Sequence, residues 1–386
     1  MRVLMTSTPG PGHVLPMVPI ARALQAAGHQ VIWATGPDAH HLITAAGLDV
    51  VTSGTDQATR TQRFRAGWPQ AGALAPRERR ALMFPVLFAT LSAQLMHSDL
   101  RAVIGEHRPD LIVHEPCELA AAPLAHGLGI PHATVGFGRF LPPRLLASAT
   151  DEVADLWDSS GSAAPDDLGL YDHAYLHPLP ASLEPATPGG TVHLVRPLSY
   201  DGSDEPITAG ARRDRPSLYV TFGTEFGAMA PWAAVIEAIS SLDVDALLTV
   251  GGAVDPASLG ALPAGVRVER WVPQRRALAG SDLVVSHGGS GAMIGVASTG
   301  LPHLMLPMAA DHFENADMIA GRGLGAVLEP PDVSAEAVAS GIAQLLDDDE
   351  VRARAEVTAT EIAAMPGPDD AVGLLEQLVT GRRASG

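Results

Sequence analysis

The first 35 residues, MRVLMTSTPGPGHVLPMVPIARALQAAGHQVIWAT, hold the pattern that decides the fold. The short apolar run Val3–Thr6 predicts a buried strand, and Leu15–Ala27 predicts a helix. Gly28 ends that helix, because glycine accepts the backbone conformation that follows a last helical turn. Val31–Ala34 is a second apolar run. Strand, helix and strand in this order predict two parallel strands of a buried sheet with helices on its faces.

The same alternation continues along the chain and restarts after a polar interval. It predicts strands at Asp110–His114 and His132–Val135, with a helix at Leu119–Gly127 between them. Residues 197–216 break the pattern and predict an interdomain linker. The second half predicts helices at Trp232–Ser241 and Ala316–Gly321 and strands at Ser217–Thr221, Ala246–Val250, Val266–Arg270, Leu283–Ser286, His303–Leu306 and Ala326–Leu328.

This organisation predicts an α/β fold of two Rossmann-like, doubly wound parallel-sheet domains that face each other across a cleft. We place the domains at residues 1–205 and 206–366. Residues 367–386 form a tail, whose helix at Ala371–Thr380 has no strand after it and is expected to pack back on the first domain. Ligands of such sheets bind at the carboxyl ends of the strands, so the loops there are the places to search.

Composition excludes several classes of function. With 43 acidic and 25 basic residues the formal net charge is −18, which disfavours nucleic acid and anionic membranes as partners. All the basic residues are arginine, so chemistry that needs lysine, such as a Schiff base or a Walker loop, is excluded. One cysteine, Cys117, allows no internal disulfide. We find no apolar run of about 18 residues and no signal-peptide cleavage pattern, and expect a soluble, cytoplasmic protein.

The loop after the first strand contains one histidine, His13. It is not a dinucleotide loop, because Gly10 and Gly12 lack a third glycine at Leu15. Histidine titrates near neutral pH and is the commonest general base, so His13 is a candidate for that role. A loop histidine in solvent is the alternative.

Three loops of the second half add further candidates. Ser286–Gly291 follows a strand and opens a helix, so its glycines and free N–H groups predict a phosphate site with His287 beside it. Trp271, after another strand, offers a stacking face for a nucleobase, with a place in the core as an equal alternative. Asp311 and His312 supply a carboxylate and an imidazole that suit sugar hydroxyls.

Taken together, these loops resemble the glycosyltransferases of actinobacterial natural-product biosynthesis, the macrolide, enediyne and aromatic-polyketide type with the GT-B fold. The similarity runs nearly from end to end. Its motifs are G-H-x-x-P at Gly12–Pro16, the turn Pro178–Pro185, Arg196-Pro197 with Tyr200-Asp201-Gly202, Thr221–Thr224, Trp271–Gln274, His287-Gly288-Gly289, Gly300-Leu301-Pro302, Asp311 and Asn315-Ala316.

The resemblance implies roles for the candidate residues. His13 would deprotonate the acceptor hydroxyl with Glu115 as its carboxylate partner, in an acceptor-binding N-terminal domain. The donor would be a dTDP- or UDP-linked sugar in the C-terminal domain, without a metal or other cofactor. Trp271 would stack on the base, Asp311 would hold sugar hydroxyls, and the whole donor set would be Thr224, Trp271, Val272, Gln274, His287, Gly289, Ser290, Gly291, Asp311 and His312.

Four positions depart from the family pattern. Glu115 stands where the family has an aspartate, so the carboxylate is one methylene longer. Ala292 replaces a phosphate-facing Thr or Ser, which leaves Ser290 or backbone N–H groups to compensate. Gly295 replaces the ribose-binding Glu of plant relatives. His312 replaces the usual Gln after the sugar-binding Asp, which puts the donor sugar in doubt.

The resemblance thus implies an inverting, metal-independent glycosyltransferase. It would move a sugar or deoxysugar, expected to be dTDP-linked, to a hydrophobic natural-product aglycone or a partly glycosylated intermediate. Residues 52–94 and 137–188 should line the acceptor pocket. Asp243 and Asp245 mimic a metal-binding D-x-D motif but precede a strand, and a solvated turn is favoured for them; for Cys117 we expect simple burial. A sugar-nucleotide 2-epimerase, a non-catalytic partner subunit and homodimer formation stay open.

Overall fold

The computed structural model describes residues 1–189, 192–200 and 214–383 and divides into two compact units. Unit 1 comprises Met1–Leu179, Ala186–Gly202 and Met365–Gly386, and unit 2 comprises Pro180–Pro185 and Ser203–Ala364. The predicted boundary at 205/206 and the motif residues Asp201-Gly202 lie outside the described residues.

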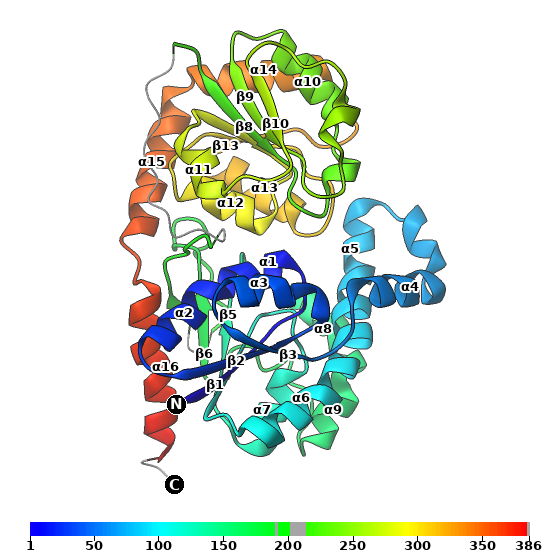
Figure 1. Cartoon of the computed structure of the whole chain (residues 1–386), viewed down its shortest axis with the longest axis vertical. Helices are drawn as coiled ribbons and strands as arrows, with labels where there is room; N and C mark the ends of the chain where they lie inside the picture. Colours follow the sequence, from blue (N-terminus) through cyan, green and yellow to red (C-terminus); the bar gives the residue numbers. More distant parts are fainter. Residues whose placement is uncertain (190–191, 201–213, 384–386) are drawn as a thin grey trace. The chain divides into compact units, whose positions relative to one another are not determined.

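Unit 1 is built on a seven-stranded parallel sheet in the order β3-β2-β1-β4-β5-β6-β7 (Figure 1). Strand order reverses between β1 and β4, which is the switch point where such sheets bind ligands. The strands are β1 (Arg2–Thr6), β2 (Gln30–Thr35), β3 (Asp49–Thr52), β4 (Leu111–His114), β5 (His132–Val135), β6 (Ala174–His177) and β7 (Val192–Leu194).

Helices cover both faces of this sheet, because successive strand residues point to opposite sides. Val3 and Met5 face a core closed by α2, α3 and α16, whereas Leu4 faces a second core closed by α6 to α9. The helices are α1 (Pro11–Val14), α2 (Val18–Ala26), α3 (His40–Ala45), α4 (Gln57–Gly67), α5 (Pro76–Phe84), α6 (Gln94–His107), α7 (Ala121–Leu128), α8 (Pro143–Thr150), α9 (Ala154–Ser159) and α16 (Pro368–Arg383).

The helix expected at Leu15–Ala27 is broken into shorter pieces. The chain runs through α1, a 3-10 turn at Leu15–Met17 and then α2. Pro16 and Pro19 have no N–H to donate, so one uninterrupted α-helix cannot form here. His13 belongs to the short helix α1, which begins at Pro11, rather than to a loop, and this corrects the sequence-based expectation.

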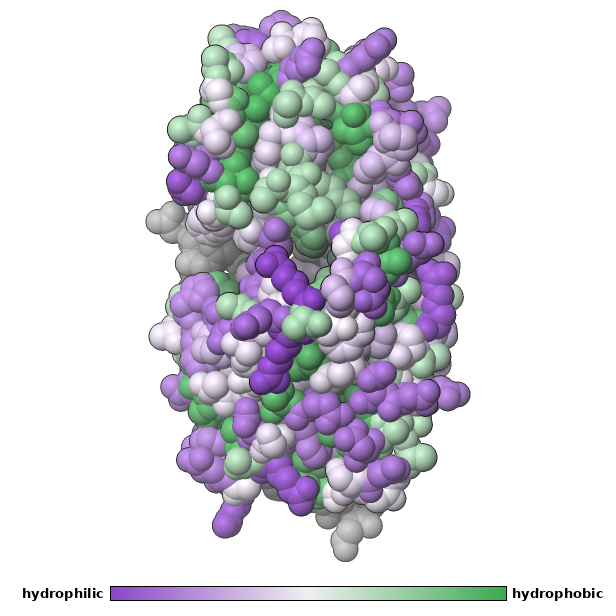
Figure 2. Space-filling view, turned by 90° about the vertical axis from the view of Figure 1, so that its right-hand side faces the viewer, coloured by the Kyte–Doolittle hydropathy of each residue, from purple (hydrophilic) through white to green (hydrophobic). Residues whose placement is uncertain are grey.

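Among the described residues, the continuous helical segment Pro76–His107 is long and apolar enough to cross a membrane by length and composition, although the sequence predicted no apolar run of about 18 residues. It consists of α5, a π-helix at Pro85–Ala93 and α6. Its residues Phe84, Met96 and Leu100 lie in the core of unit 1. On the face shown in Figure 2, hydrophilic side chains are interspersed with apolar ones. The segment is therefore anchored on the core of unit 1 by part of its apolar surface.

Unit 2 is a six-stranded parallel sheet in the order β10-β9-β8-β11-β12-β13, flanked by helices (Figure 1). The strands are β8 (Ser217–Thr221), β9 (Asp245–Thr249), β10 (Val266–Glu269), β11 (Leu283–Ser286), β12 (His303–Met305) and β13 (Gly325–Val327). The helices are α10 (Trp232–Ser240), α11 (Gln274–Ala279), α12 (Ser290–Ala297), α13 (His312–Gly321), α14 (Ala335–Asp347) and α15 (Asp349–Ala363). All six predicted strands are present, with ends that differ by one residue at most.

The C-terminal helix α16 belongs to unit 1 by its contacts. Ala371, Val372, Leu375 and Val379 lie in the same core as Val18 and Ile20 of α2. They are buried at 6% exposure or less, so α16 completes one face of the first sheet.

Candidate active site

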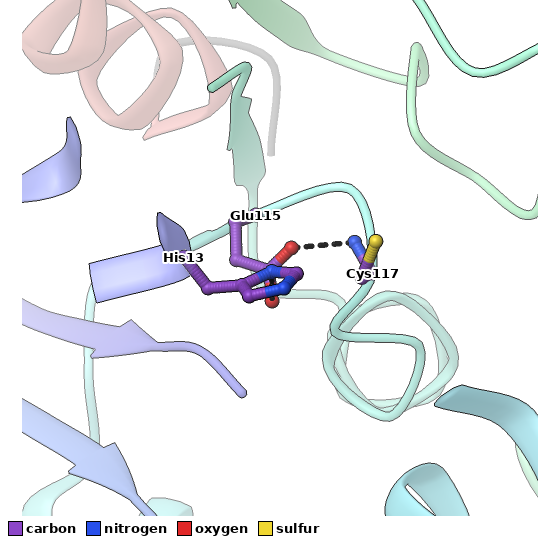
Figure 3. Close-up of side chains that lie close together, drawn as sticks. All are labelled: His13, Glu115 and Cys117. Atoms are coloured by element: carbon purple, nitrogen blue, oxygen red, sulfur yellow. Dashed lines mark hydrogen bonds and ion pairs between the residues drawn. The ribbon is translucent and has the colours of Figure 1, made fainter. Parts of the chain in front are cut away.

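His13 and Glu115 form a close pair in unit 1. Helix α1 presents the imidazole, and Glu115 directly follows β4, the strand beside β1 (Figure 3). Nδ1 of His13 lies 3.2 Å from Oε1 of Glu115. The N–H does not point straight at the oxygen, and such loosened contacts are common in unliganded enzymes. The contact turns Nε2 of His13 away from the carboxylate, which is the orientation a general base needs.

The Glu115 carboxylate is fully buried and well satisfied. The N–H and Oγ1–H of Thr8 donate to Oε1 at 3.1 and 2.9 Å, and the N–H of Cys117 donates to Oε2 at 2.6 Å. Burial raises the pKa of Glu115, but His13 and these N–H groups outweigh it and hold the pKa below its usual value. The carboxylate is therefore an anion at neutral pH, and its longer side chain is accommodated without loss of the contact to His13.

Two phenylalanine rings flank the His13 imidazole. The ring of Phe88 lies 5.5 Å from it, centroid to centroid, and that of Phe137 lies 4.8 Å from it at a steep angle. Both rings are partly exposed. They come from the two segments that were expected to line an acceptor pocket.

In unit 2, His287 is held in a narrow space between glycines. A Cβ added at Gly289 would lie 2.6 Å from Nε2 of His287, and one added at Gly223 would lie 2.9 Å from the same atom. Burial and the neighbouring His312 lower the pKa of His287 to about 3. His287 is therefore neutral at pH 7, so any anion beside it meets a neutral imidazole rather than a cation.

Asp311 is tied to the start of α12. Its Oδ2 accepts hydrogen bonds from Oγ of Ser290 at 2.5 Å and from Nδ2 of Asn315 at 2.9 Å. The single hydroxyl proton of Ser290 is thus engaged, and Ser290 cannot replace the missing hydroxyl of Ala292 toward a phosphate in this arrangement. Of the two compensating groups that the sequence left open, the backbone N–H groups at the start of α12 are the ones the structure favours.

His312, the first residue of α13, is fixed in one tautomer. Its Nδ1 accepts from the N–H of Met308 at 3.4 Å and of Ala309 at 3.2 Å, so the proton of a neutral ring is on Nε2. The ring packs edge-on against His287 at 4.4 Å and Phe226 at 4.7 Å. His312 is thus a preset N–H donor, whereas a glutamine side chain would offer both a donor and an acceptor.

The candidate base-binding residues lie after β10. Trp271 is 57% exposed, which excludes the core alternative and leaves its ring free to stack. Gln274 lies along α12, where its Nε2 is 3.4 Å from the carbonyl oxygen of Gly291. A Cβ at Gly295 would lie 2.9 Å from Oε1 of Gln274, so the glycine makes room for this side chain. The side chain of Gln274 thus fills the space next to Gly295, the position at which plant relatives have the ribose-binding glutamate.

Two further predicted residues differ in their surroundings. Thr224 is exposed in the turn after β8, one residue beyond the glycine that contacts His287. Val272 is partly buried and packs against a small core with Tyr219 and Ala277.

The D-x-D mimic at the amino end of β9 is paired with an arginine. Nε of Arg215 lies 2.8 Å from Asp243, and its NH1 lies 3.6 Å from Asp245. A cation would have to compete with this guanidinium, which supports the interpretation of a structural turn.

Within the described ranges, one set of side chains has the spacing of a metal site. Ligand atoms of His13, Glu115 and Cys117 lie within 4.8 Å of one another (Figure 3). Cys117 is buried, as expected, but its place beside the candidate base was not foreseen. Oε1 of Glu115 already accepts two hydrogen bonds from Thr8 and Oε2 accepts one from Cys117, so most of the acceptor capacity of the carboxylate is used. This donor set therefore fits a hydrogen-bonded base better than a metal centre.

Comparison with known proteins assigns the family. The erythromycin biosynthesis protein CIII-like N-terminal domain matches residues 22–205, and the corresponding C-terminal domain matches residues 233–378. The chain belongs to this family. It is a glycosyltransferase with the GT-B fold, as its two parallel sheets and its structural neighbours show.

Individual relatives match over nearly the whole length. The chain is 33% identical to the L-demethylnoviosyl transferase of Streptomyces niveus, covering 95% of this chain and 96% of that protein. It is 32% identical to the elloramycin glycosyltransferase ElmGT of Streptomyces olivaceus, covering 97% of each. The spinosyn rhamnosyltransferase SpnG complexed with thymidine diphosphate is 27% identical and superposes with a TM-score of 0.80, covering 97% of this chain and all of that one.

Proposed function

We propose that this glycosyltransferase transfers a sugar or deoxysugar from a dTDP-linked donor to a hydrophobic natural-product acceptor, with inversion and without a metal ion. The observation that carries the proposal is the pairing of His13 Nδ1 with the buried carboxylate of Glu115 at 3.2 Å. A carboxylate at Nδ1 fixes the imidazole in one tautomer and leaves Nε2 as the base. A non-catalytic partner subunit would not need a histidine that is held in this orientation.

In the proposed reaction the acceptor oxygen attacks the anomeric carbon of the donor sugar. Its O–H proton passes to Nε2 of His13, and the bond from the anomeric carbon to the phosphate oxygen breaks. The electron pair leaves with dTDP. A single displacement of this kind inverts the anomeric centre. Glu115 compensates the positive charge that His13 acquires.

The leaving diphosphate would be held by the N-terminus of α12 and by His287. The free N–H groups of a helix's first turn bind anions, and preorganised donors at developing charge supply much of a catalytic effect. Asp311, with Oδ2 bound to Ser290 and Asn315, would hold sugar hydroxyls. His312 would add its Nε2–H as a donor. Trp271 would stack on the thymine ring.

The nucleotide preference gives a test in solution. Gly295 has no side chain to bind ribose hydroxyls, and Gln274 lies across the space above it. The structural neighbour SpnG forms a complex with thymidine diphosphate. We expect dTDP to bind roughly tenfold more tightly than UDP, since an unpaired 2′-hydroxyl in the site costs about 1–3 kcal/mol. Competition calorimetry measures the ratio, and a preference for UDP would contradict it.

Metal independence gives a second test. The proposed site stabilises the diphosphate with N–H groups, so turnover should be unchanged in excess EDTA. A loss that Mg²⁺ restores would point to Asp243 and Asp245. A loss that Zn²⁺ restores would point to the group of His13, Glu115 and Cys117, and Cys117→Ser would then be the variant to measure.

Activity measurements also distinguish the proposed function from two other functions. A 2-epimerase of this fold would convert the nucleotide sugar without an acceptor, and nuclear magnetic resonance of the donor alone detects that product. A non-catalytic partner subunit would show no His13-dependent turnover. A cytoplasmic location, the absence of nucleic-acid and integral membrane partners, and homodimer formation belong to the proposal as well.

A further inference from the structure

The surroundings of the proposed base are aromatic rather than polar. Because Glu115 takes Nδ1 of His13, an acceptor must deliver its hydroxyl to Nε2. Phe137 and Phe88 stand 4.8 and 5.5 Å from the imidazole, and Phe84 stands 5.5 Å from Phe88. The first two rings are partly exposed, so they present aromatic surface to whatever carries that hydroxyl.

The position of Phe88 depends on an unusual backbone. Phe88 lies within the π-helix Pro85–Ala93, which begins where proline removes a donor from the helix. Hydroxyls support the wider turn, because Oγ1 of Thr90 donates to the carbonyl of Pro85 and Oγ of Ser92 to that of Leu87, each five residues back. Segments of this kind are rare and occur frequently at functional sites. Here the segment carries the ring that contacts the base.

We propose that the acceptor of this enzyme is a flat aromatic molecule that presents a phenolic hydroxyl to His13, held between Phe88 and Phe137. The inference rests on the proposed function and deepens it by naming the acceptor class. Aromatic pairs prefer to stack or meet edge to face at centroid separations of about 4.5–7 Å. Both phenylalanines stand at such separations from the imidazole that the acceptor must approach.

The His13–Glu115 pair is compatible with a phenolic acceptor hydroxyl. The buried carboxylate of Glu115 accepts hydrogen bonds from Thr8 and Cys117 besides its contact with His13. A phenol loses its proton near pH 10, as tyrosine does, whereas an aliphatic alcohol is far less acidic. A phenolic oxygen therefore gives up its proton to an imidazole more readily than an aliphatic hydroxyl does. In transfer, that oxygen bonds to the anomeric carbon, its proton goes to Nε2 of His13, and dTDP leaves with the electron pair.

The test uses two probes with the same carbon skeleton. 2-Naphthol and its saturated counterpart decahydro-2-naphthol carry the same hydroxyl, but only the first has a π-system. Calorimetric titration of the intact protein with each, in the presence of dTDP, needs no knowledge of the natural sugar. We expect 2-naphthol to bind at least tenfold more tightly. The saturated probe buries comparable apolar surface, so area alone would give no such preference.

Variants locate the preference on the two rings. Phe88→Leu and Phe137→Leu keep the apolar volume and remove the π-system, and each should reduce the naphthol preference at least threefold. Trp232→Leu is the control for the loss of an aromatic ring elsewhere, since Trp232 packs against Phe222 in the core of unit 2, and it is expected to leave the preference unchanged. Thermal stabilisation by dTDP verifies that each variant is folded.

The possible results separate this inference from the proposed function. Equal binding of the two probes by the unmodified protein, or full retention of the preference in both leucine variants, would overturn the phenolic acceptor. If dTDP binds and His13-dependent transfer occurs with aliphatic alcohols only, the proposed function stands and this inference falls. Selective naphthol binding without any dTDP binding would support the aromatic subsite and refute the donor.

Discussion

Replacing His13 with alanine is expected to reduce sugar transfer by about a hundredfold to ten-thousandfold, the usual contribution of a general base. The affinity for dTDP should stay nearly unchanged, because the proposed donor residues belong to unit 2 and His13 to unit 1. Single-turnover rates and calorimetry with dTDP measure the two quantities on the same preparation. A parallel loss of dTDP affinity would mean that His13 contributes to donor binding instead.

The partner carboxylate is tested in the same series. Glu115→Gln should cost less than His13→Ala, since the base remains while its orientation is degraded. Glu115→Gln should also lower the stability of the protein. The NH₂ group of the new amide would face the N–H donor of Thr8 or of Cys117, which would leave a buried donor without an acceptor. Glu115→Asp restores the shorter carboxylate typical of the family and should be more active than Glu115→Gln.

Non-additivity decides whether the two residues act together. If Glu115 works through His13, the double variant His13→Ala, Glu115→Gln should be little slower than His13→Ala alone. Fully additive losses would show that Glu115 acts elsewhere and that the carboxylate partner of His13 has been misassigned.

The fold was predictable from the sequence because parallel strands leave a local signal. Runs such as Leu283–Ser286 are apolar on both faces and are followed by glycine-rich loops, which marks both the strand and its carboxyl end. The broken helix around His13 could also have been foreseen, since Pro16 and Pro19 are visible in the sequence. The candidate loops were found for the same reason, because motif and strand end coincide.

The contacts inside the site could not be predicted in this way. Thr8 and Glu115 are 107 residues apart, and no local pattern announces their hydrogen bonds. The sequence likewise offered the Ser290 hydroxyl to a phosphate, whereas the fold gives it to Asp311. Phe88 escaped notice because its orientation depends on a π-helix that propensities do not reveal. Such contacts depend on side-chain geometry across the sheet.

The second large effect on turnover is expected from a substitution at one of the glycines around His287. Gly289→Ala places a Cβ 2.6 Å from Nε2 of His287, so the imidazole must move away from the start of α12. Gly289 has an extended backbone with φ −60°, which alanine adopts without strain, so the ring is what gives way. We expect turnover to fall by about a hundredfold to a thousandfold, the effect of removing one donor from an anion hole.

Gly373→Ala is the control for adding a methyl group to a glycine. It lies within α16 of unit 1, outside the proposed donor residues, and a Cβ there has no atom within 4 Å. It should leave turnover within about twofold and stabilise the helix by about 0.5–1 kcal/mol, as alanine does relative to glycine in a helix interior. Gly223 offers no such clean comparison, because its φ of +70° would add backbone strain to the contact with His287.

A variant of His287 shows whether the Gly289 effect is transmitted through the imidazole. With His287→Ala as background, the alanine at 289 has no ring to displace, and it should cause little further loss of turnover or of dTDP affinity. Wild-type turnover in Gly289→Ala would show that the ring is not a donor to the diphosphate. An equal loss in both backgrounds would mean that the backbone N–H groups of the loop, rather than His287, are what the added methyl disturbs.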